Sequence, residues 1–287
     1  MSQQFPRTTV GGISLSRMII GTNWMLGWSH TSPAADQLIK STHNSKEAML
    51  PLLSTFLSHG VDTIMGPISS QPLMHDAIQY AGEAAQRKII IIDTPIINVG
   101  ADAQSRKEAY ETIRQSAAIG SAFCLIHHSS AEKLVRKDTE TIERLDEYTK
   151  MIREQGMIPG LSAHMPELIV YSDANGYDVE TYIQIYNCMG FLMQVEVEYI
   201  SKIIHNARKP VMTIKPMAAG RVTPYVGFNF VWNTIRPCDM VTVGCMTEQE
   251  AQEDVEISLA AIERRFPEMG PRSSPNPNQA AFANKDS

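Results

Sequence analysis

Several features that mark specialised classes of protein are scarce or missing in this chain. The longest apolar runs, such as the isoleucines at 89–92, are far shorter than the roughly 20 residues that a membrane-spanning helix needs. The opening residues 1–7 lack the apolar centre of a secretory signal, and no block of basic residues stands out against a net charge of −6. We therefore expect a cytoplasmic protein whose partners include neither membranes nor nucleic acids.

Cysteine is also sparse. The four cysteines are scattered without a C-x-x-C motif, at Cys124, Cys188, Cys238 and Cys245. This usage is typical of reduced, partly buried thiols in a cytosolic protein. No G-x-G-x-x-G motif follows the first strand-like segment, which argues against a dinucleotide-binding open sheet. Methionine, in contrast, occurs 16 times, and we interpret it as adaptable core filler rather than as a binding surface.

Short β-rich segments alternate with longer helix-like segments along the chain. Most of the short segments are continuously apolar, which is typical of parallel strands buried on both faces. They cover residues 16–21, 61–65, 88–93, 122–127, 157–161, 181–186, 211–215 and 240–243. Strands that alternate with helices in this number predict a single (β/α)8 barrel. An open, doubly wound sheet is the alternative.

The segments between the strands have helical patterns and end signals. A helix is predicted over residues 45–59, with Ser45 as its N-cap and Gly60 after its end, and others over 131–155, 196–206 and 248–265. A barrel of this kind commonly occupies a chain of this size as one domain. We predict one domain over residues 1–270. Residues 271–287, rich in Pro, Ser, Asn and Ala, are predicted to form a mobile tail.

Several segments resemble aldo-keto reductases, and they occur in that family's order. Residues 10–22 look like the family's opening hairpin and first strand, and residues 59–62 look like its approach to the second strand. The further similar segments are Ile126-His127, Tyr186-Asn187, residues 215–222 and residues 243–249. Together they span nearly the whole barrel. The resemblance implies a closed barrel with the hairpin at residues 8–14 across its base.

The same resemblance shows that most of the family's catalytic residues are replaced. Met65 stands at the position of the family's aspartate, and no tyrosine follows in residues 66–70. The family's lysine position falls near Asp93-Thr94, so that only the histidine survives, as His127. In the family, the tyrosine donates a proton to the carbonyl group. Its loss implies that carbonyl reduction by that route has no acid.

The family's nicotinamide site is replaced as well. Ser162-Ala163 stands where the family has Ser-Asn, and Ile214 stands where an aromatic residue stacks on the nicotinamide ring. Thr247 occupies a position near the 2′-phosphate where the family commonly has arginine. Because these losses fall in separate segments, the resemblance disfavours NADP as a cofactor.

Polar residues stand at the carboxyl ends of the predicted strands, where barrel enzymes carry their active sites. We predict that four of them converge on one pocket and act in catalysis, namely Asp93, His127, His164 and Lys215. A second set is predicted to bind the substrate and consists of Asn23, Trp24, Tyr186 and Asn187. Inward-facing groups at these ends share one cavity, where they supply acid–base groups and a cation.

Each of these residues also has a plainer interpretation. Asp93 serves equally well as a cap for the turn after its strand, and His164 as a cap for the following helix. His128 alternates with His127 and is expected to face the helices. For Lys215, anchoring an anionic substrate is favoured over formation of an imine.

A metal site is a further alternative. Asp93, His127 and His164 make up two histidines and a carboxylate, a common set of ligands for a divalent metal. They come from three separate strands and show no H-x-H or H-E-x-x-H spacing. A divalent metal therefore stays open, and no residue is assigned as its ligand.

The polar rim and the replaced nicotinamide site lead to three hypotheses about function. The first is a cofactor-independent lyase, isomerase or hydrolase that acts on a small polar substrate such as a sugar or hydroxy acid. The second is an NAD(P)-dependent oxidoreductase with an altered set of catalytic residues. The third is a metal-dependent barrel enzyme or a non-catalytic binding protein. We favour the first.

Overall fold

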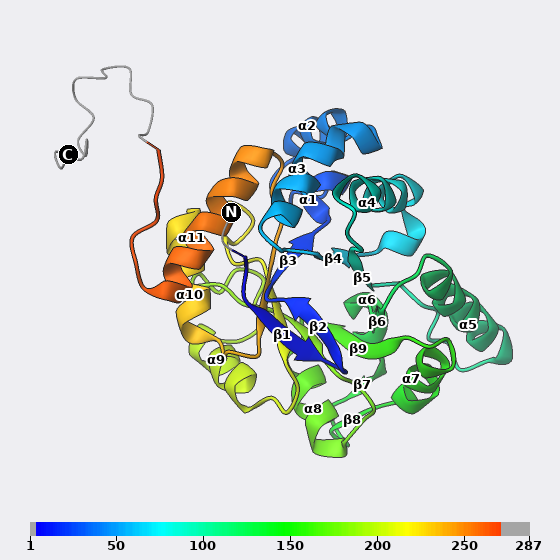
Figure 1. Ribbon diagram of the computed structural model, residues 1–287. Helices are drawn as coiled ribbons and strands as arrows, with labels where there is room; N and C mark the ends of the chain where they lie inside the picture. The colour runs from blue at the N-terminus through cyan, green and yellow to red at the C-terminus, as the bar shows by residue number, and fades with distance from the viewer. Residues whose placement is uncertain (1–3, 271–287) are drawn as a thin grey trace.

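Eight parallel strands close into a barrel in the computed structural model, which describes residues 4–270 (Figure 1). The strands are β3 (Met18–Gly21), β4 (Thr63–Gly66), β5 (Ile90–Asp93), β6 (Phe123–Ile126), β9 (Ile158–Ala163), β10 (Tyr182–Ile185), β11 (Val211–Ile214) and β12 (Met240–Val243). Each overlaps one predicted segment. Pairing of β12 with β3 closes the ring, which confirms the predicted (β/α)8 barrel and rules out an open sheet.

An antiparallel hairpin closes one end of the barrel, as the sequence predicts. Its strands are β1 (Arg7–Val10) and β2 (Ile13–Ser16), joined by Gly11 and Gly12, which both have positive φ. A two-residue turn of this type needs positive φ at both positions, and glycine adopts it without steric cost. Side chains of the hairpin pack into the barrel interior, so this end is plugged and the opposite end is left for function.

The barrel interior is filled by every second side chain of the strands. The interior set contributed by the strands is Ile19, Met65, Ile92, Phe123, Leu125, Ile158, Ile183, Met212 and Met240. Their neighbours along the strands, such as Ile64, Ile91 and Cys124, pack against the helices instead. Burial on both faces explains why the strands have continuous apolar runs. It also makes the direction of each strand-end residue depend on its place in the alternation.

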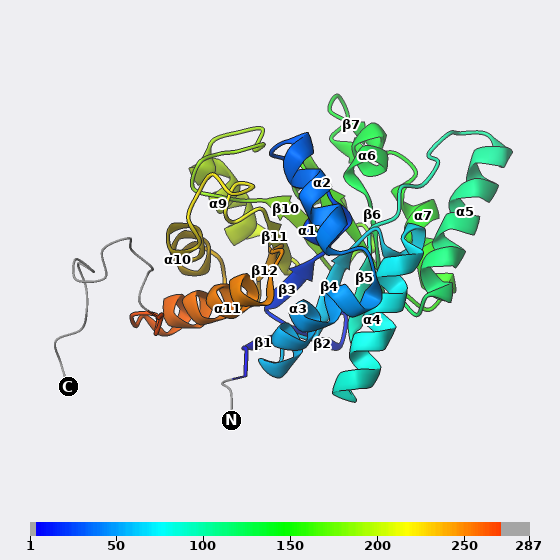
Figure 2. The same ribbon diagram turned by 90° about the horizontal axis from the view of Figure 1, so that it is seen from above.

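Helices surround the barrel, and short helical segments lie over its mouth. The outer helices are α3 (Lys46–Ser58), α4 (Pro72–Ala85), α5 (Ala103–Ala118), α7 (Leu145–Glu154), α8 (Glu167–Asn175), α9 (Val197–Asn206), α10 (Pro224–Thr234) and α11 (Glu248–Glu263). The others are α1 (Asn23–Leu26), α2 (Pro33–Thr42), α6 (His128–Ala131) and the 3-10 segments Ile68–Ser70 and Glu132–Leu134. Figure 2 shows α1 and α6 on the side opposite the hairpin.

The predicted N-cap of α3 is present, and α11 begins with a capping box that was not predicted. The hydroxyl of Ser45 accepts a hydrogen bond from the amide of Ala48, as expected of an N-cap. Thr247 and Glu250 form a reciprocal capping box at the start of α11. The predicted helices at 45–59, 196–206 and 248–265 are confirmed to within two residues at each end.

The predicted helix over residues 131–155 is wrong in its first half. A small hairpin of β7 (Val135–Arg136) and β8 (Thr141–Ile142) occupies that part, and α7 begins only at Leu145. Glu140 and Arg144 have positive φ, which ends a helix at either position. The charged composition concealed this turn, because charge alone does not distinguish a helix from a hairpin.

Two sequence predictions concern the ends and the thiols of the chain. The predicted tail over residues 271–287 lies outside the described residues, so the boundary at residue 270 stays a prediction. All four cysteines are free, and Cys124 and Cys245 are buried. Among the helices within residues 4–270, none combines the length and the apolar character needed to cross a bilayer.

Candidate active site at the barrel mouth

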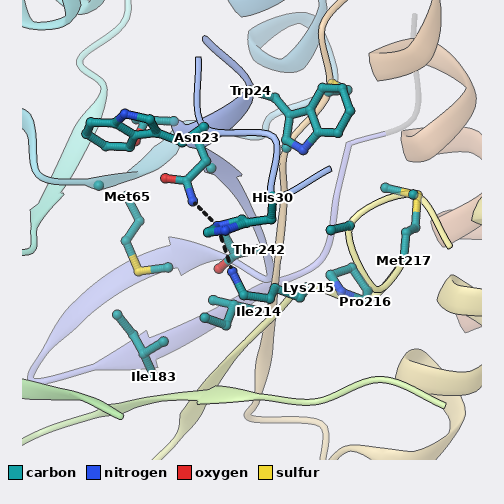
Figure 3. A pocket seen from close by; sticks show the side chains of 18 of the residues that line it. Asn23, Trp24, His30, Met65, Ile183, Ile214, Lys215, Pro216, Met217 and Thr242 are labelled. Carbon is teal, nitrogen blue, oxygen red and sulfur yellow. Dashed lines mark hydrogen bonds between the residues drawn. The ribbon is translucent and has the colours of Figure 1, made fainter. Parts of the chain in front are cut away.

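A cavity of about 690 Å³ opens at the carboxyl ends of the strands. This volume is within the range of small-molecule sites. Met65 and Ile183, which belong to the interior cluster, form part of its floor together with Ile214 (Figure 3). Trp24 and Trp28 contribute aromatic walls. An apolar floor below a polar rim lowers the local dielectric and so strengthens the electrostatic effect of each polar group.

Lys215 is a cation at the rim of the cavity, which Arg221 also lines. It follows β11 directly, and its Nζ lies 3.1 Å from Nε2 of His30 (Figure 3). Burial lowers the pKa of Lys215 to about 8, and no charged neighbour contributes to this shift. Both Lys215 and His30 have positive φ, at 61° and 58°. Non-glycine residues held in this conformation cost free energy and are concentrated at functional sites.

Two donors share the Nε2 atom of His30. Besides Lys215, the side-chain amide nitrogen of Asn23 lies 3.2 Å away. An ammonium and an NH2 group both donate, so Nε2 accepts and the ring is neutral with its hydrogen on Nδ1. Burial lowers the pKa of His30, and the charge of Lys215 lowers it further. At neutral pH this wall therefore combines a protonated lysine with an uncharged imidazole.

A second wall of the cavity carries three histidine rings. His127 and His128 have ring centroids 4.2 Å apart, and His128 stacks on His164 at 3.7 Å. Burial, and next the proximity of His128, lower the pKa of both His127 and His164 to about 4. These two rings are uncharged at pH 7, where they serve as hydrogen-bond donors and acceptors rather than as cations.

Glu132 braces this second wall from the segment that follows α6. Its Oε1 accepts hydrogen bonds from the backbone amides of His164 at 2.7 Å and Met165 at 2.9 Å. Its Oε2 lies 3.9 Å from Nδ1 of His128. The carboxylate thus fixes the turn after β9 and the position of the histidine stack.

The ligand atoms of His128, Glu132 and His164 lie within 4.8 Å of one another, which makes this group a candidate metal site. Two histidines and a carboxylate are a common ligand set. The two rings are nearly parallel, at 21°, so their nitrogen lone pairs run side by side instead of meeting at one point. One carboxylate oxygen is already occupied by two backbone amides. Binding a metal here requires the rings to rotate.

Asp93 does not reach the cavity, so its predicted place at the mouth is wrong. Its carboxylate accepts hydrogen bonds from the amide of Ser69 at 3.0 Å and the hydroxyl of Ser116 at 2.5 Å. Because Ile92 faces the interior, the next residue faces outward toward the helices. Asp93 therefore ties the segment after β4 to α5. The predicted metal set of Asp93, His127 and His164 is not brought together.

Tyr186 and Asn187 also lie away from the cavity. Tyr186 continues the outward face that begins with Tyr182, and its hydroxyl donates to the hydroxyl of Thr234 on α10 at 3.0 Å. The side chain of Asn187 accepts from the amides of residues 189 and 191 and donates to the carbonyl of residue 191. Both residues support the loop after β10. Their predicted contact with substrate is replaced by a structural role.

The structure brings together the other predicted residues and adds two that were missed. Asn23, Trp24, His127, His164 and Lys215 all line the cavity, and their predicted roles stay predictions; His30 and His128 join them. His128 was expected to face the helices, but β6 ends at Ile126 and α6 begins at His128, so the strand alternation no longer applies. His30 lies in a loop far from any strand end. No periodic signal in the sequence marks it.

Comparison with known proteins shows the fold. No family profile matches the chain, and no curated protein sequence matches it. A provisionally named aldo-keto reductase from Pseudomonas aeruginosa superposes with a TM-score of 0.64 at 14% identity, covering 91% of this chain and 98% of that one. An aldo/keto reductase from Klebsiella pneumoniae, solved with NADP and acetate, gives 0.56 at 13% identity over 93% and 92%. Aldose reductase from Giardia lamblia gives 0.53 at 11% over 93% and 90%.

One end of the cavity tests whether a nicotinamide dinucleotide suits these residues. At the start of α11, Oε2 of Glu250 accepts from the amides of Met246 at 2.7 Å and Thr247 at 3.1 Å. Backbone amides at such a turn are the groups that bind a phosphate, and here a carboxylate occupies them. This end of the cavity does not fit an anionic phosphate.

Proposed function

We propose that this protein is a cofactor-independent acid–base enzyme of the lyase, isomerase or hydrolase type, acting on a small polar substrate such as a sugar or hydroxy acid. The observation that carries the proposal is the 3.1 Å contact between half-buried Lys215 and the neutral, solvent-exposed ring of His30 at the mouth of the barrel. A cation without a carboxylate partner, beside an uncharged base and above an apolar floor, is suited to stabilising negative charge that develops on a substrate oxygen.

In this mechanism Lys215 and His30 divide the work. A carbonyl or hydroxyl oxygen of the substrate takes the hydrogen bond of the Lys215 ammonium, which stabilises an enolate or alkoxide as it forms. Loss of that donor frees Nε2 of His30 to accept a proton from the neighbouring carbon or hydroxyl group. Asn23, which contacts the same Nε2 atom, orients the ring. The lysine stays protonated at neutral pH because the pKa of Lys215 is about 8.

The second wall is proposed to bind the substrate rather than to change its charge. His127 and His164 are neutral at pH 7, since burial lowers the pKa of each to about 4. Neutral imidazoles donate and accept hydrogen bonds, as the hydroxyl groups of a sugar or hydroxy acid require. Trp24 and Trp28 cover the apolar faces of such a molecule.

We also propose that NADP takes no part in the reaction. The support is the carboxylate of Glu250, which occupies the turn amides that would otherwise bind a phosphate. An NAD(P)-dependent oxidoreductase is supported by the fold alone, and one fold hosts many chemistries. The proposed partner is a small molecule.

Exchange of substrate protons in heavy water tests the proposal. The purified protein, without added cofactor, is incubated with dihydroxyacetone, glyceraldehyde, glycolate and lactate, and loss of the C–H signal next to the oxygenated carbon is followed by NMR. We expect exchange with the wild type, loss of exchange with Lys215→Met, and no change with Lys202→Met on α9. Tight binding of NADPH together with turnover that requires it would contradict the proposal.

A further inference from the structure

Lys215 has a different kind of partner from Lys137 and Lys209. Lys137 pairs with Glu167 at 2.5 Å and Lys209 pairs with Glu180 at 3.1 Å, so each of these ammonium groups lies against a carboxylate. Lys215 instead meets the uncharged Nε2 of His30 at 3.1 Å inside the cavity. A neutral acceptor holds the amine in place without holding its proton. Such an amine is accessible as a nucleophile.

The backbone directs this amine into the cavity. Lys215 precedes Pro216, and the residue before a proline normally takes an extended conformation, yet Lys215 has a φ of 61°. His30 also has a positive φ and belongs to a loop 185 residues away in sequence. Two unusual backbone conformations in separate segments thus bring one amine and one imidazole together. Figure 3 shows the two side chains meeting above Ile214 and near Thr242.

We propose that Lys215 forms a covalent imine with the carbonyl group of the substrate, and that His30 carries the protons of this step. The inference rests on the proposed function of the same cavity and narrows its substrate class to aldehydes, ketones and 2-oxo acids. The pocket lining suits such molecules, because apolar Met65 and Ile214 lie beside polar His127 and His164. Lys215 then acts through a covalent bond as well as through its charge.

The step balances with the groups present in the cavity. Nε2 of His30 first accepts a proton from the Lys215 ammonium. The freed Nζ lone pair attacks the carbonyl carbon, the C–N bond forms, and the C=O π electrons move to oxygen, which takes this proton from His30. The added nitrogen passes its own proton to Nε2 of His30, which returns it to the hydroxyl group. The C–O bond breaks, water leaves, and an iminium ion remains. The iminium withdraws electrons from an adjacent C–H or C–C bond, and addition of water reverses the sequence.

Reductive trapping tests this inference. The full-length protein is incubated with pyruvate, dihydroxyacetone or glyceraldehyde and treated with sodium cyanoborohydride, which reduces an iminium to a stable secondary amine. We expect intact mass to rise by one carbonyl molecule less one oxygen atom, and peptide mapping to place the adduct on Lys215. Lys215→Arg should abolish this adduct, and Lys202→Arg on the outer helix α9 should leave it unchanged.

The role of His30 is tested by the rate of trapping. His30→Ala should slow formation of the Lys215 adduct by roughly 100-fold, the usual effect of losing a positioned proton carrier. Circular dichroism of each variant checks that the barrel is intact. The wild-type experiment decides the matter even where a variant fails to fold, because the position of the adduct is read from the native protein.

The outcome separates this inference from the proposed function. An adduct on Lys215 with all three carbonyl compounds, or with one of them, supports the imine. An adduct spread over exposed lysines, or none on Lys215, overturns it. Proton exchange in heavy water is measured in the same samples. Exchange without an adduct on Lys215 leaves the acid–base function standing and the imine refuted, whereas absence of exchange counts against the proposed function itself.

Discussion

The wall of the cavity that follows β3 and β11 and the wall that follows β6 and β9 both carry partly desolvated nitrogen bases, yet the bases differ in charge at neutral pH. Burial lowers the pKa of Lys215 from 10.5 to about 8 and the pKa of His127 from 6.5 to about 4. The same physical effect therefore leaves a lysine that exchanges its proton near physiological pH and a histidine that stays neutral. We call these the lysine wall, which carries Lys215 and His30, and the histidine wall, which carries His127, His128 and His164; our proposal assigns the chemistry to the first and substrate hydrogen bonding to the second.

Removing the cation should have the largest effect. Lys215→Met keeps an unbranched side chain, one atom shorter, and removes its charge, and we expect a loss of activity of about 100- to 1,000-fold, the usual result of deleting a group that stabilises developing charge. The measurement is the rate of cofactor-free proton exchange. Thermal unfolding should show no destabilisation, since burial of the Lys215 charge opposes folding. A Lys215→Met variant that keeps the wild-type rate of proton exchange would contradict the assignment of the chemistry to Lys215.

Asp93 lies outside both walls of the cavity, so its substitution should affect stability rather than activity. Asp93→Ala removes the acceptor of hydrogen bonds from Ser69 and Ser116, so we expect the free energy of unfolding to fall by about 1–3 kcal/mol. Activity at a temperature where the variant is folded should stay near that of the wild type. Chemical denaturation and proton exchange together check this. A folded variant without activity would place Asp93 in the chemistry after all.

Protonation of the histidine wall should lower the free energy of unfolding in acid. Folded His127 and His164 have pKa values of about 4 against 6.5 for free histidine, so the unfolded chain binds more protons between these values. Stability is therefore complete above about pH 6.5 and falls as the pH drops toward 4. We expect each ring to account for about 1–2 kcal/mol of this loss, after allowance for solvent screening.

Denaturation at pH 7 and pH 5 measures this effect. A variant with both His127→Asn and His164→Asn should lose less stability between the two pH values than the wild type does. Equal losses in the two proteins would show that the histidine wall is protonated as easily as free histidine. His127 and His164 would then be partly protonated near neutral pH, and the difference in charge between the two walls would be smaller than proposed.

The smallest effect is expected from removal of metal. The near-parallel rings of His128 and His164 do not converge on one point, and Glu132 is engaged with two backbone amides. We therefore expect dialysis against EDTA to leave proton exchange unchanged, and elemental analysis to find no stoichiometric zinc, iron or manganese. A loss of exchange that added Zn²⁺ restores would move the chemistry to the histidine wall.

The strands could be predicted from sequence because burial on both faces leaves an apolar run that composition alone reveals. The residues Lys215, His127 and His164 could be placed at the mouth for the same reason, since each stands at the end or just beyond a strand. The direction of a strand-end residue was less certain. A difference of one position in the alternation turns a side chain from the cavity to the helices, as at Asp93.

The main residue that could not be predicted is His30. It reaches the cavity through a loop with a positive φ, and a pattern of apolar and polar residues carries no information about such a conformation. Tyr186 was misplaced for a different reason. Its ring faces outward, and its hydroxyl group donates a hydrogen bond to Thr234 on α10, a contact that the spacing of residues in the sequence does not show.

Direct titration of the Lys215 amine is the measurement closest to the central claim. The Nζ signals of lysine are followed by NMR from pH 6 to pH 11, and the Lys215 signal is identified by its loss in Lys215→Met. We predict a midpoint near pH 8, as the pKa of about 8 implies, well below the value of about 10.4 for a lysine side chain in a model peptide. A Lys215 midpoint close to the model-peptide value would contradict the account, because the amine would then be neither desolvated nor poised for chemistry.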